Sequence, residues 1–178
     1  IIGDKNDSNI IWLGGIGIGL IKYHKYDGVM KQYVADTSDK NSIISDSINC
    51  MAFDELGNLW IGTDLGISKF DVKNNKFTSY DISDGLTNNF VNSILFDDSN
   101  NPWISTNKGI SKINVQNGQV FNYTKMDGIK GTQFYVNSSL KLDDGTMMFG
   151  SIDGITYFNP ENIVNIENPV DDIVIGDI

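Results

Sequence analysis

Short apolar runs alternate with clusters of Asn, Asp, Ser and Gly along most of the chain. The pattern is clearest between residues 91 and 123, where four runs follow one another: Val91–Phe96, Trp103–Thr106, Ile110–Asn114 and Val120–Tyr123. Runs of this length, bounded by residues that tolerate positive φ, are typical of β-strands joined by tight turns. Apolar residues do not follow the helical spacing over three turns anywhere, so the sequence predicts an all-β chain.

The strand pattern repeats. Four segments resemble one another, each with a large apolar residue in second place: Ile11–Gly15, Leu59–Thr63, Pro102–Thr106 and Met147–Ser151. Their second positions, 12, 60, 103 and 148, lie 48, 43 and 45 residues apart. A period of about 40 to 50 residues with four strands per unit indicates a β-propeller blade. We therefore predict about four four-stranded antiparallel blades.

The repeat also sets approximate blade boundaries and a set of structural residues. The predicted blades cover residues 1–46, 47–89, 90–135 and 136–168. One blade cannot bury both faces of its sheet alone, so a large recurring side chain is expected to fill the space between neighbouring sheets. We assign this role to Trp12, Trp60 and Trp103, and we expect Phe149 of the fourth unit to be structural as well. Met148 replaces the tryptophan in the fourth unit, which suggests a variant, terminal repeat.

Composition excludes several classes of protein. The chain has 178 residues, and 13 Lys and Arg stand against 23 Asp and Glu, giving a net charge of -10. This charge repels a phosphate backbone and an anionic membrane surface, so no nucleic-acid partner is expected. There is no apolar window of about 18 residues and no signal-peptide pattern at the N-terminus. The single cysteine, Cys50, allows neither an internal disulfide nor a CxxC metal site.

One stretch of the second unit carries a family resemblance. The segments Asn58–Thr63, Gly66–Asp71, Phe77–Tyr80 and Asp84–Leu86 resemble the two-component regulator propeller repeat. The resemblance implies the extracytoplasmic sensor region of a Bacteroidetes-type hybrid two-component histidine kinase that responds to polysaccharide fragments. It therefore implies a periplasmic location, as part of an inner-membrane protein whose cytoplasmic kinase is absent from this chain.

The C-terminal part of the sequence refines this resemblance. Residues 133–160 are similar to the last propeller repeat of such sensors, and residues 169–178 resemble the opening of the immunoglobulin-like linker domain that follows. We expect the chain to be a segment of a larger, seven-bladed propeller. Its expected partners are the remaining blades and the linker domain of the same protein, with membrane contact only through the parts outside this chain. Unpaired flanks of the first and fourth blades would otherwise pair with another copy, giving a homodimer.

Catalytic and metal-binding motifs are weak. The single histidine, His24, is expected at the surface without a nucleophile beside it, and Cys50 is expected as a small buried side chain. The glycine run Gly14–Gly19 lies between two strands and not before a helix, so turn geometry explains it better than phosphate binding. The acidic turns Asp4–Asn9 and Asp97–Asn101 lack the EF-hand pattern. We predict no catalytic residue, no metal and no cofactor.

Propeller topology nevertheless predicts where a ligand would bind. The loops between the second and third strands, and the connections from one blade to the next, gather on one face around the channel. Aromatic rings, amides and carboxylates on that face would suit an oligosaccharide. The candidate ligand residues are Asp64, Asn88, Asn89, Phe90, Asn107, Lys108, Gln133, Phe134, Tyr135 and Asp153.

Three functional interpretations follow. The first is a sensor segment that recognises polysaccharide-derived oligosaccharides and passes the signal to the kinase. The second is a scaffold or dimerisation propeller that binds no ligand. The third is a propeller lyase or hydrolase, which would need a cluster of His or acidic groups at the channel mouth and has only His24 to offer.

Overall fold

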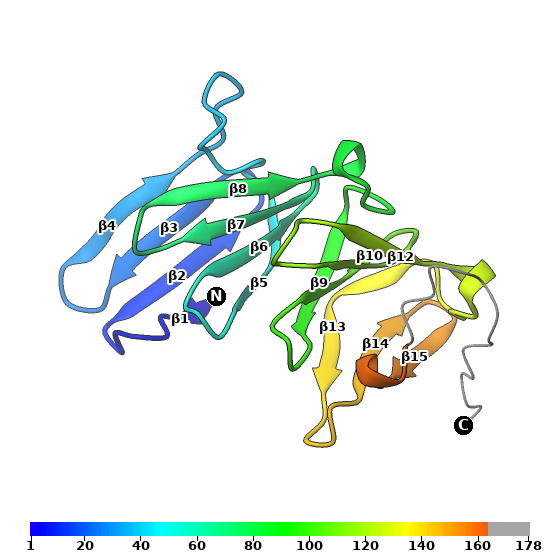
Figure 1. Ribbon diagram of the computed structural model, residues 1–178. Helices are drawn as coiled ribbons and strands as arrows, with labels where there is room; N and C mark the ends of the chain where they lie inside the picture. The colour runs from blue at the N-terminus through cyan, green and yellow to red at the C-terminus, as the bar shows by residue number, and fades with distance from the viewer. Residues whose placement is uncertain (164–178) are drawn as a thin grey trace.

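The computed structural model describes residues 1–163, which form a row of β-sheets arranged along an open arc (Figure 1). The first blade contains β1 (Ile2–Gly3), β2 (Ile10–Gly15), β3 (Gly19–His24) and β4 (Gly28–Tyr33). The second contains β5 (Ile48–Phe53), β6 (Leu59–Thr63), β7 (Ile67–Asp71) and β8 (Lys76–Tyr80). The third contains β9 (Val91–Phe96), β10 (Pro102–Thr106), β11 (Gly109–Ile113) and β12 (Val120–Tyr123). The described part of the fourth contains β13 (Phe134–Lys141), β14 (Met147–Ser151) and β15 (Gly154–Phe158).

Within each sheet, strands that follow one another in sequence are hydrogen-bonded neighbours, and all pairings are antiparallel. The prediction of an all-β chain built from propeller blades is therefore confirmed. The helices of the described residues are three short 3-10 turns, Ile82–Asp84, Lys125–Asp127 and Pro160–Asn162. The predicted boundary at residue 168 and the predicted start of a linker domain over 169–178 lie outside the described residues.

The predicted strands of the third repeat agree with the structure to within a residue. β10 begins at Pro102 because Pro102 already lies opposite Phe96 in the ladder. β11 ends at Ile113, since the backbone of Asn114 bonds to Gln119 in the turn that leads to β12. These are the differences that arise when an apolar pattern, and not the hydrogen-bond ladder, defines the ends of a strand.

The core is divided into three clusters, each between two neighbouring blades, which we call joints 1, 2 and 3. Joint 1 contains Ile10, Trp12, Leu20, Ile43, Ile48, Leu59, Ile61, Phe70 and Phe77. Joint 2 contains Cys50, Trp60, Ile67, Leu86, Val91, Ile94, Ile104 and Ile113. Joint 3 contains Trp103, Ile110, Ile129, Phe134, Met147 and Phe149. Each tryptophan lies on the second strand of its blade and contributes to the joint with the following blade, so burial of apolar surface holds the blades side by side.

Two glycines allow the blades to approach closely. A Cβ atom on Gly14 would lie 2.8 Å from Ile48 of the following blade, and a Cβ atom on Gly62 would lie 2.5 Å from Val91 of the following blade. A side chain at either position would therefore push the next inner strand away. In joints 1 and 2 the packing therefore requires the glycine that follows the tryptophan by two residues, whereas the third blade has Ser105 at this position.

Each of the first three blades also contains a tryptophan that contacts an aspartate and a lysine, and we call these three residues the Asp-Trp-Lys set. The indole Nε1 donates to the aspartate at 2.8 Å in the first blade, 3.0 Å in the second and 3.1 Å in the third. The lysine on the neighbouring strand places Nζ over the indole ring, 5.2 to 5.6 Å from the ring centre. The three sets are Asp4, Trp12 and Lys22; Asp54, Trp60 and Lys69; and Asp97, Trp103 and Lys112. These contacts satisfy the buried indole N–H and cover the outer face of the ring.

Candidate functional site

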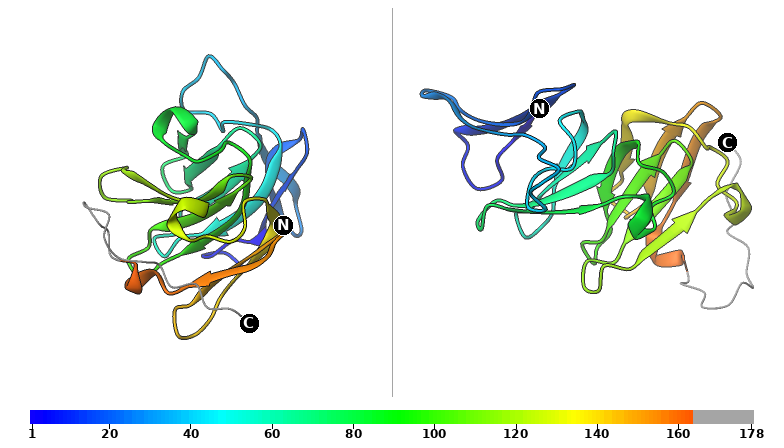
Figure 2. Two further views of the ribbon diagram at one scale, coloured as in Figure 1. Left: turned by 90° about the vertical axis from the view of Figure 1, so that its right-hand side faces the viewer. Right: turned by 90° about the horizontal axis from the view of Figure 1, so that it is seen from above.

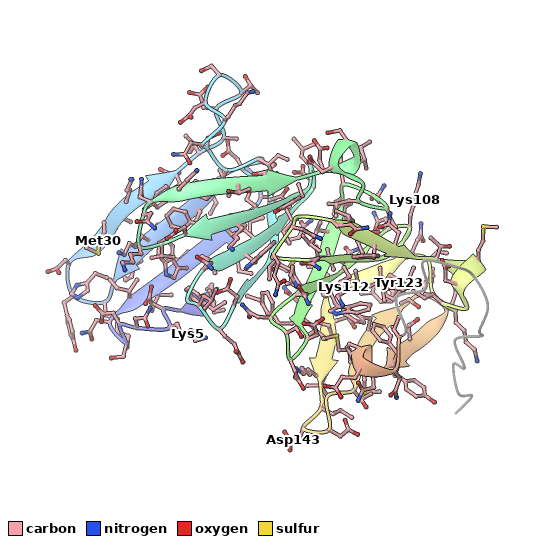
Figure 3. All side chains as sticks on the ribbon, viewed as in Figure 1. Lys5, Met30, Lys108, Lys112, Tyr123 and Asp143 are labelled. Carbon is pink, nitrogen blue, oxygen red and sulfur yellow. The ribbon has the colours of Figure 1, made fainter. Side chains whose placement is uncertain are left out.

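One face of the arc is formed by the loops between second and third strands and by the connections between blades, and we call it the upper face. Backbone hydrogen bonds join the two kinds of loop. Gly19 N donates to Asp46 O at 2.9 Å, and Ile152 N donates to Gln133 O at 3.0 Å. Figure 3 shows Lys108 on this side of the molecule and Asp143 at the tip of a hairpin on the opposite side. The two kinds of loop are thus hydrogen-bonded to each other on this side of the molecule.

The connections that cross the upper face have a repeated local design. Asp81 caps the first 3-10 turn and accepts from Ser83 N, and Gly85 ends the turn with φ 108°. In the second turn, Thr124 is the cap and accepts from Met126 N, and Gly128 ends the turn with φ 87°. A left-handed residue at the end of such a turn favours glycine, because a Cβ atom is strained there. Hydrogen bonds from Ser83 lower the pKa of Asp81, so the cap is ionised at neutral pH.

Buried hydroxyl groups hold these connections against the blades. Ser68 Oγ accepts from Ile44 N at 3.0 Å, and Ser111 Oγ accepts from Thr87 N at 3.1 Å. The residues just before these two N–H groups, Ile43 and Leu86, are buried in joints 1 and 2. The upper face is therefore positioned by the same packing that joins the blades.

The predicted ligand residues differ in exposure. Those that are exposed are Asn107, Lys108, Gln133, Tyr135 and Asp153. Those that are partly buried are Asp64, Asn88, Asn89 and Phe90. Phe134 is the exception, because its ring is 4% exposed and belongs to joint 3, with Phe149 at a centroid distance of 6.2 Å. The structure therefore places Phe134 in the core, where the blade packing it supports leaves no free ring for a ligand.

Several of the polar candidates already have protein partners. Asp64 Oδ1 accepts from Ser45 Oγ, and Asn107 Oδ1 accepts from Asn92 Nδ2 at 3.0 Å. Asp153 lies 3.8 Å from Lys125 Nζ, and both side chains are exposed. The two hydrogen bonds fix the orientation of the Asp64 and Asn107 side chains, and their partners were not among the predicted residues.

The two asparagines of the second connection shape their own loop. Asn88 Oδ1 accepts from Phe90 N at 3.0 Å, and Asn89 Oδ1 accepts from Ile82 N at 2.9 Å. Such side-chain bonds to nearby backbone stabilise turns. The carbonyl oxygens of both amides are thus engaged in holding the loop.

The inner strand of the fourth blade carries an enlarged bulge that the sequence pattern does not predict. Phe134 lies opposite Ser151, and Ser139 lies opposite Phe149. Between these two pairs the chain advances by five residues on β13 but by only two on β14. At the bulge of β5 the chain advances by two residues, from Ile48 to Cys50, while β6 advances by one. The bulge of β13 is therefore larger by two residues. Bulges often lie beside functional sites, where they redirect side chains.

This bulge is anchored to the inner strands of two other blades. Asn137, with φ 55°, donates from Nδ2 to Asn49 O at 3.2 Å, and Tyr135 O accepts from Ser93 Oγ at 3.5 Å. Tyr135 and Val136 remain 56% and 46% exposed. The bulge thus presents an aromatic ring on a segment that is held by hydrogen bonds.

The described residues do not contain a group of three His, Cys, Asp or Glu side chains that could hold a metal ion. Cys50 is buried in joint 2, and burial raises the pKa of its thiol to about 12. His24 is partly buried at the end of β3, with Nδ1 2.5 Å from Asp27 Oδ2. The thiol is therefore held neutral, and the imidazole pairs with a carboxylate and not with a nucleophile.

Comparison with known proteins defines the repeat. Residues 42–64 match the family model described as the two component regulator propeller. The matched segment contains β5 and β6 of the second blade. The resemblance predicted from the sequence is thereby confirmed. No curated protein sequence matches the chain.

Solved structures extend the similarity over nearly the whole chain. The extracellular domain of the hybrid two component system BT3049 from B. thetaiotaomicron is 26% identical, with a TM-score of 0.80, over 90% of this chain and 21% of that one. The corresponding domain of BT4673 from the same organism is 16% identical, with a TM-score of 0.69, over 89% of this chain and 22% of that one. This chain therefore spans about a fifth of the length of these two relatives.

A propeller enzyme shares the fold at lower similarity. Virginiamycin B lyase from Staphylococcus aureus is 16% identical, with a TM-score of 0.59, over 86% of this chain and 50% of that one. At this identity the likeness concerns the fold alone.

Among the described residues, no helix is long and apolar enough to cross a membrane.

Proposed function

We propose that this chain is a ligand-recognition segment of an extracytoplasmic sensor of the hybrid two-component type, located in the periplasm. The observation that carries the proposal is the 26% identity to the extracellular domain of BT3049 over 90% of the chain, together with the matched propeller repeat. The kinase that would receive the signal lies outside this chain. The segment itself is proposed to be a binding module and not an enzyme.

We propose polysaccharide-derived oligosaccharides as the ligand class and the upper face as the binding surface. Support comes from three exposed side chains: the amide of Asn107 and the carboxylate of Asp153 in loops of this face, and the Tyr135 ring in the first residues of β13, which follow a connection of this face. Sugars bind through stacking of their apolar faces on aromatic rings and through hydrogen bonds to planar polar groups. The anchored bulge of β13 holds Tyr135 with less conformational freedom than a mobile loop would, which reduces the entropic cost of binding.

Calorimetric titration with a panel of oligosaccharides tests this proposal. A binding sugar is expected to lose affinity about tenfold in Tyr135→Ala and in Asn107→Ala, each of which removes an exposed side chain. The matched control is Asn117→Ala, because Asn117 is exposed in the hairpin between β11 and β12, on the opposite side of the blade. Equal loss in all three variants, or retained affinity in the first two, would contradict the upper face as the site.

The second candidate is a scaffold that joins other parts of the protein and binds no ligand. The specific observation in its favour is the pair of apolar faces at the two ends of the arc, described below. The candidates are distinguishable, since a scaffold would show protein contacts and no heat of binding with any sugar.

A further inference from the structure

The two ends of the arc carry apolar positions whose counterparts are buried in the other described blades. The residue that follows the glycine at the start of each third strand is fully buried in the first three blades, at 0% exposure for Leu20, Ile67 and Ile110. Ile155 occupies the same place in the fourth blade and is 51% exposed. The face of blade 4 that carries Ile155 therefore matches the faces that form joints 1, 2 and 3. Among the described residues no further blade packs against it.

The surroundings of Ile155 extend this uncovered surface, which we call the end face: Leu140, Met148, Gly150, Ile155 and Tyr157. Met148 lies opposite Leu140 on one side and Tyr157 on the other, so the three form a row across the sheet. The row at the same place in the third blade contains Leu95, Trp103 and Lys112. In that blade the middle residue is completely buried by the following sheet.

The end face also lacks the charges of the first three blades. Leu142 takes the place of the aspartate, since Leu142 N donates to Thr146 O just as Asp97 N donates to Asn101 O. Tyr157 takes the place of the lysine beside the central residue of the row. All three members of the Asp-Trp-Lys set are thus replaced together, and the outward face of blade 4 is more apolar than its counterparts.

The opposite end of the arc carries the complementary half, which we call the start face: Ile11, Leu13, Ile21, Tyr23 and Val29. Ile11 lies opposite Tyr23, and Tyr23 lies opposite Val29. The same row in the second blade contains Leu59, Phe70 and Phe77, which are buried in joint 1. In the first blade this row is only partly buried, and Val29 is exposed.

We propose that the end face of blade 4 binds the start face of another propeller blade, and that a second copy supplies it in the isolated chain. The argument is continuity with joints 1, 2 and 3, because the same strand positions form every one of these interfaces. Both halves are present on one chain, at opposite ends of the arc (Figure 2). Two apolar sheet faces of this kind gain free energy by excluding water, whereas a sugar would leave most of its hydroxyl groups unpaired.

The partnership is head-to-tail, so it can be tested with one substitution at each end. Ile155→Asp places a charge on the end face, and Leu13→Asp places one on the start face. We expect the wild-type chain to associate as its concentration rises in sedimentation velocity experiments, and we expect each variant alone to associate at least about tenfold more weakly. An equal mixture of the two variants retains one intact end face and one intact start face, so it is expected to form discrete dimers.

Controls make each outcome decisive. Leu56→Asp is the matched variant, because Leu56 is an exposed apolar residue in the hairpin between β5 and β6, away from both faces. Circular dichroism shows whether each variant folds. A wild-type chain that stays monomeric at all concentrations, or a mixture that forms no dimers, would overturn the proposal.

Discussion

Trp60 Nε1 donates a hydrogen bond of 3.0 Å to Asp54 Oδ2, and both side chains are about 1% exposed. The same bond joins Trp12 to Asp4 and Trp103 to Asp97. In the fourth blade both partners are replaced, by Met148 and Leu142. Asp54 also accepts from Asn58 N and Asn58 Nδ2, so replacing the aspartate leaves the buried indole N–H unpaired, whereas replacing the tryptophan removes one of three hydrogen bonds to the carboxylate.

The bond between Trp60 and Asp54 is therefore expected to show strong coupling. Trp60→Met and Asp54→Leu should each lower the free energy of unfolding by about 2 kcal/mol or more, because each leaves a buried polar group unpaired or a space unfilled. The double variant should cost less than the sum of the two by about 1 kcal/mol. Urea unfolding of the four chains measures this coupling.

The control for this cycle pairs Asp54→Leu with Trp103→Met, which belong to different Asp-Trp-Lys sets. Their effects should add to within about 0.5 kcal/mol. Equal coupling in both cycles would mean that the coupling does not come from the hydrogen bond within one set. That bond would then not explain why Met148 and Leu142 replace both partners in the fourth blade.

Gly62 is expected to tolerate no side chain. A Cβ atom added at Gly62 would overlap Cys50 Sγ and lie 2.5 Å from Val91 Cγ1, so Gly62→Ala should destabilise the chain by about 1–3 kcal/mol through overpacking of joint 2. Gly3→Ala serves as the control, because no atom lies within 4 Å of the added Cβ there. Thermal unfolding compares the two variants, and Val91→Ala should partly rescue Gly62→Ala. A neutral Gly62→Ala would contradict the close approach of the blades.

Cys50 is expected to be unreactive while joint 2 is closed. Burial raises the pKa of its thiol to about 12, so almost no thiolate exists at pH 8. Reaction with a disulfide reagent should be about a hundredfold slower in the native chain than in urea. Because the folded pKa lies above the unfolded one, stability should fall as the pH rises above about 8.5. Equal labelling rates in both states would show that the joint opens freely.

Asp97 is expected to contribute to acid denaturation. Burial acts to raise the pKa of this carboxyl, but hydrogen bonds from Asn101 and Trp103, with the nearby charge of Lys112, outweigh it and leave the pKa below its ordinary value. The stabilisation is thus present at neutral pH and is lost as the pH falls from about 4 toward the lowered folded value. Asp97→Asn should flatten the loss of stability in this range, measured by urea unfolding from pH 7 to pH 3. An unchanged pH profile would count against this role.

The sequence predicted the fold closely because a propeller blade repeats its turns and its apolar positions. The segment around Trp103 fixed the strands of the third blade to within a residue, and the joints lie where the recurring tryptophans indicated. Local pattern is sufficient here, since each blade contacts mainly its neighbours.

The candidate site was less predictable. Phe134 was expected on the ligand face and is buried, because the first residue of an inner strand packs into the joint, as Ile48 and Val91 do. The enlarged bulge that exposes Tyr135 depends on contacts with Asn49 in a blade far away in sequence. Such contacts arise from the three-dimensional arrangement of the blades and leave no local signal.

Amide chemical-shift mapping by NMR during an oligosaccharide titration tests the central claim most directly, because it reports every backbone position at once. The account predicts that a binding sugar shifts resonances of the upper face, with Asn107, Tyr135 and Asp153 among them, and leaves the opposite hairpins around Glu55 and Asn117 unchanged. Shifts confined to those hairpins, or no shift with any sugar of the panel, would contradict the claim that the upper face is the recognition surface of a sensor.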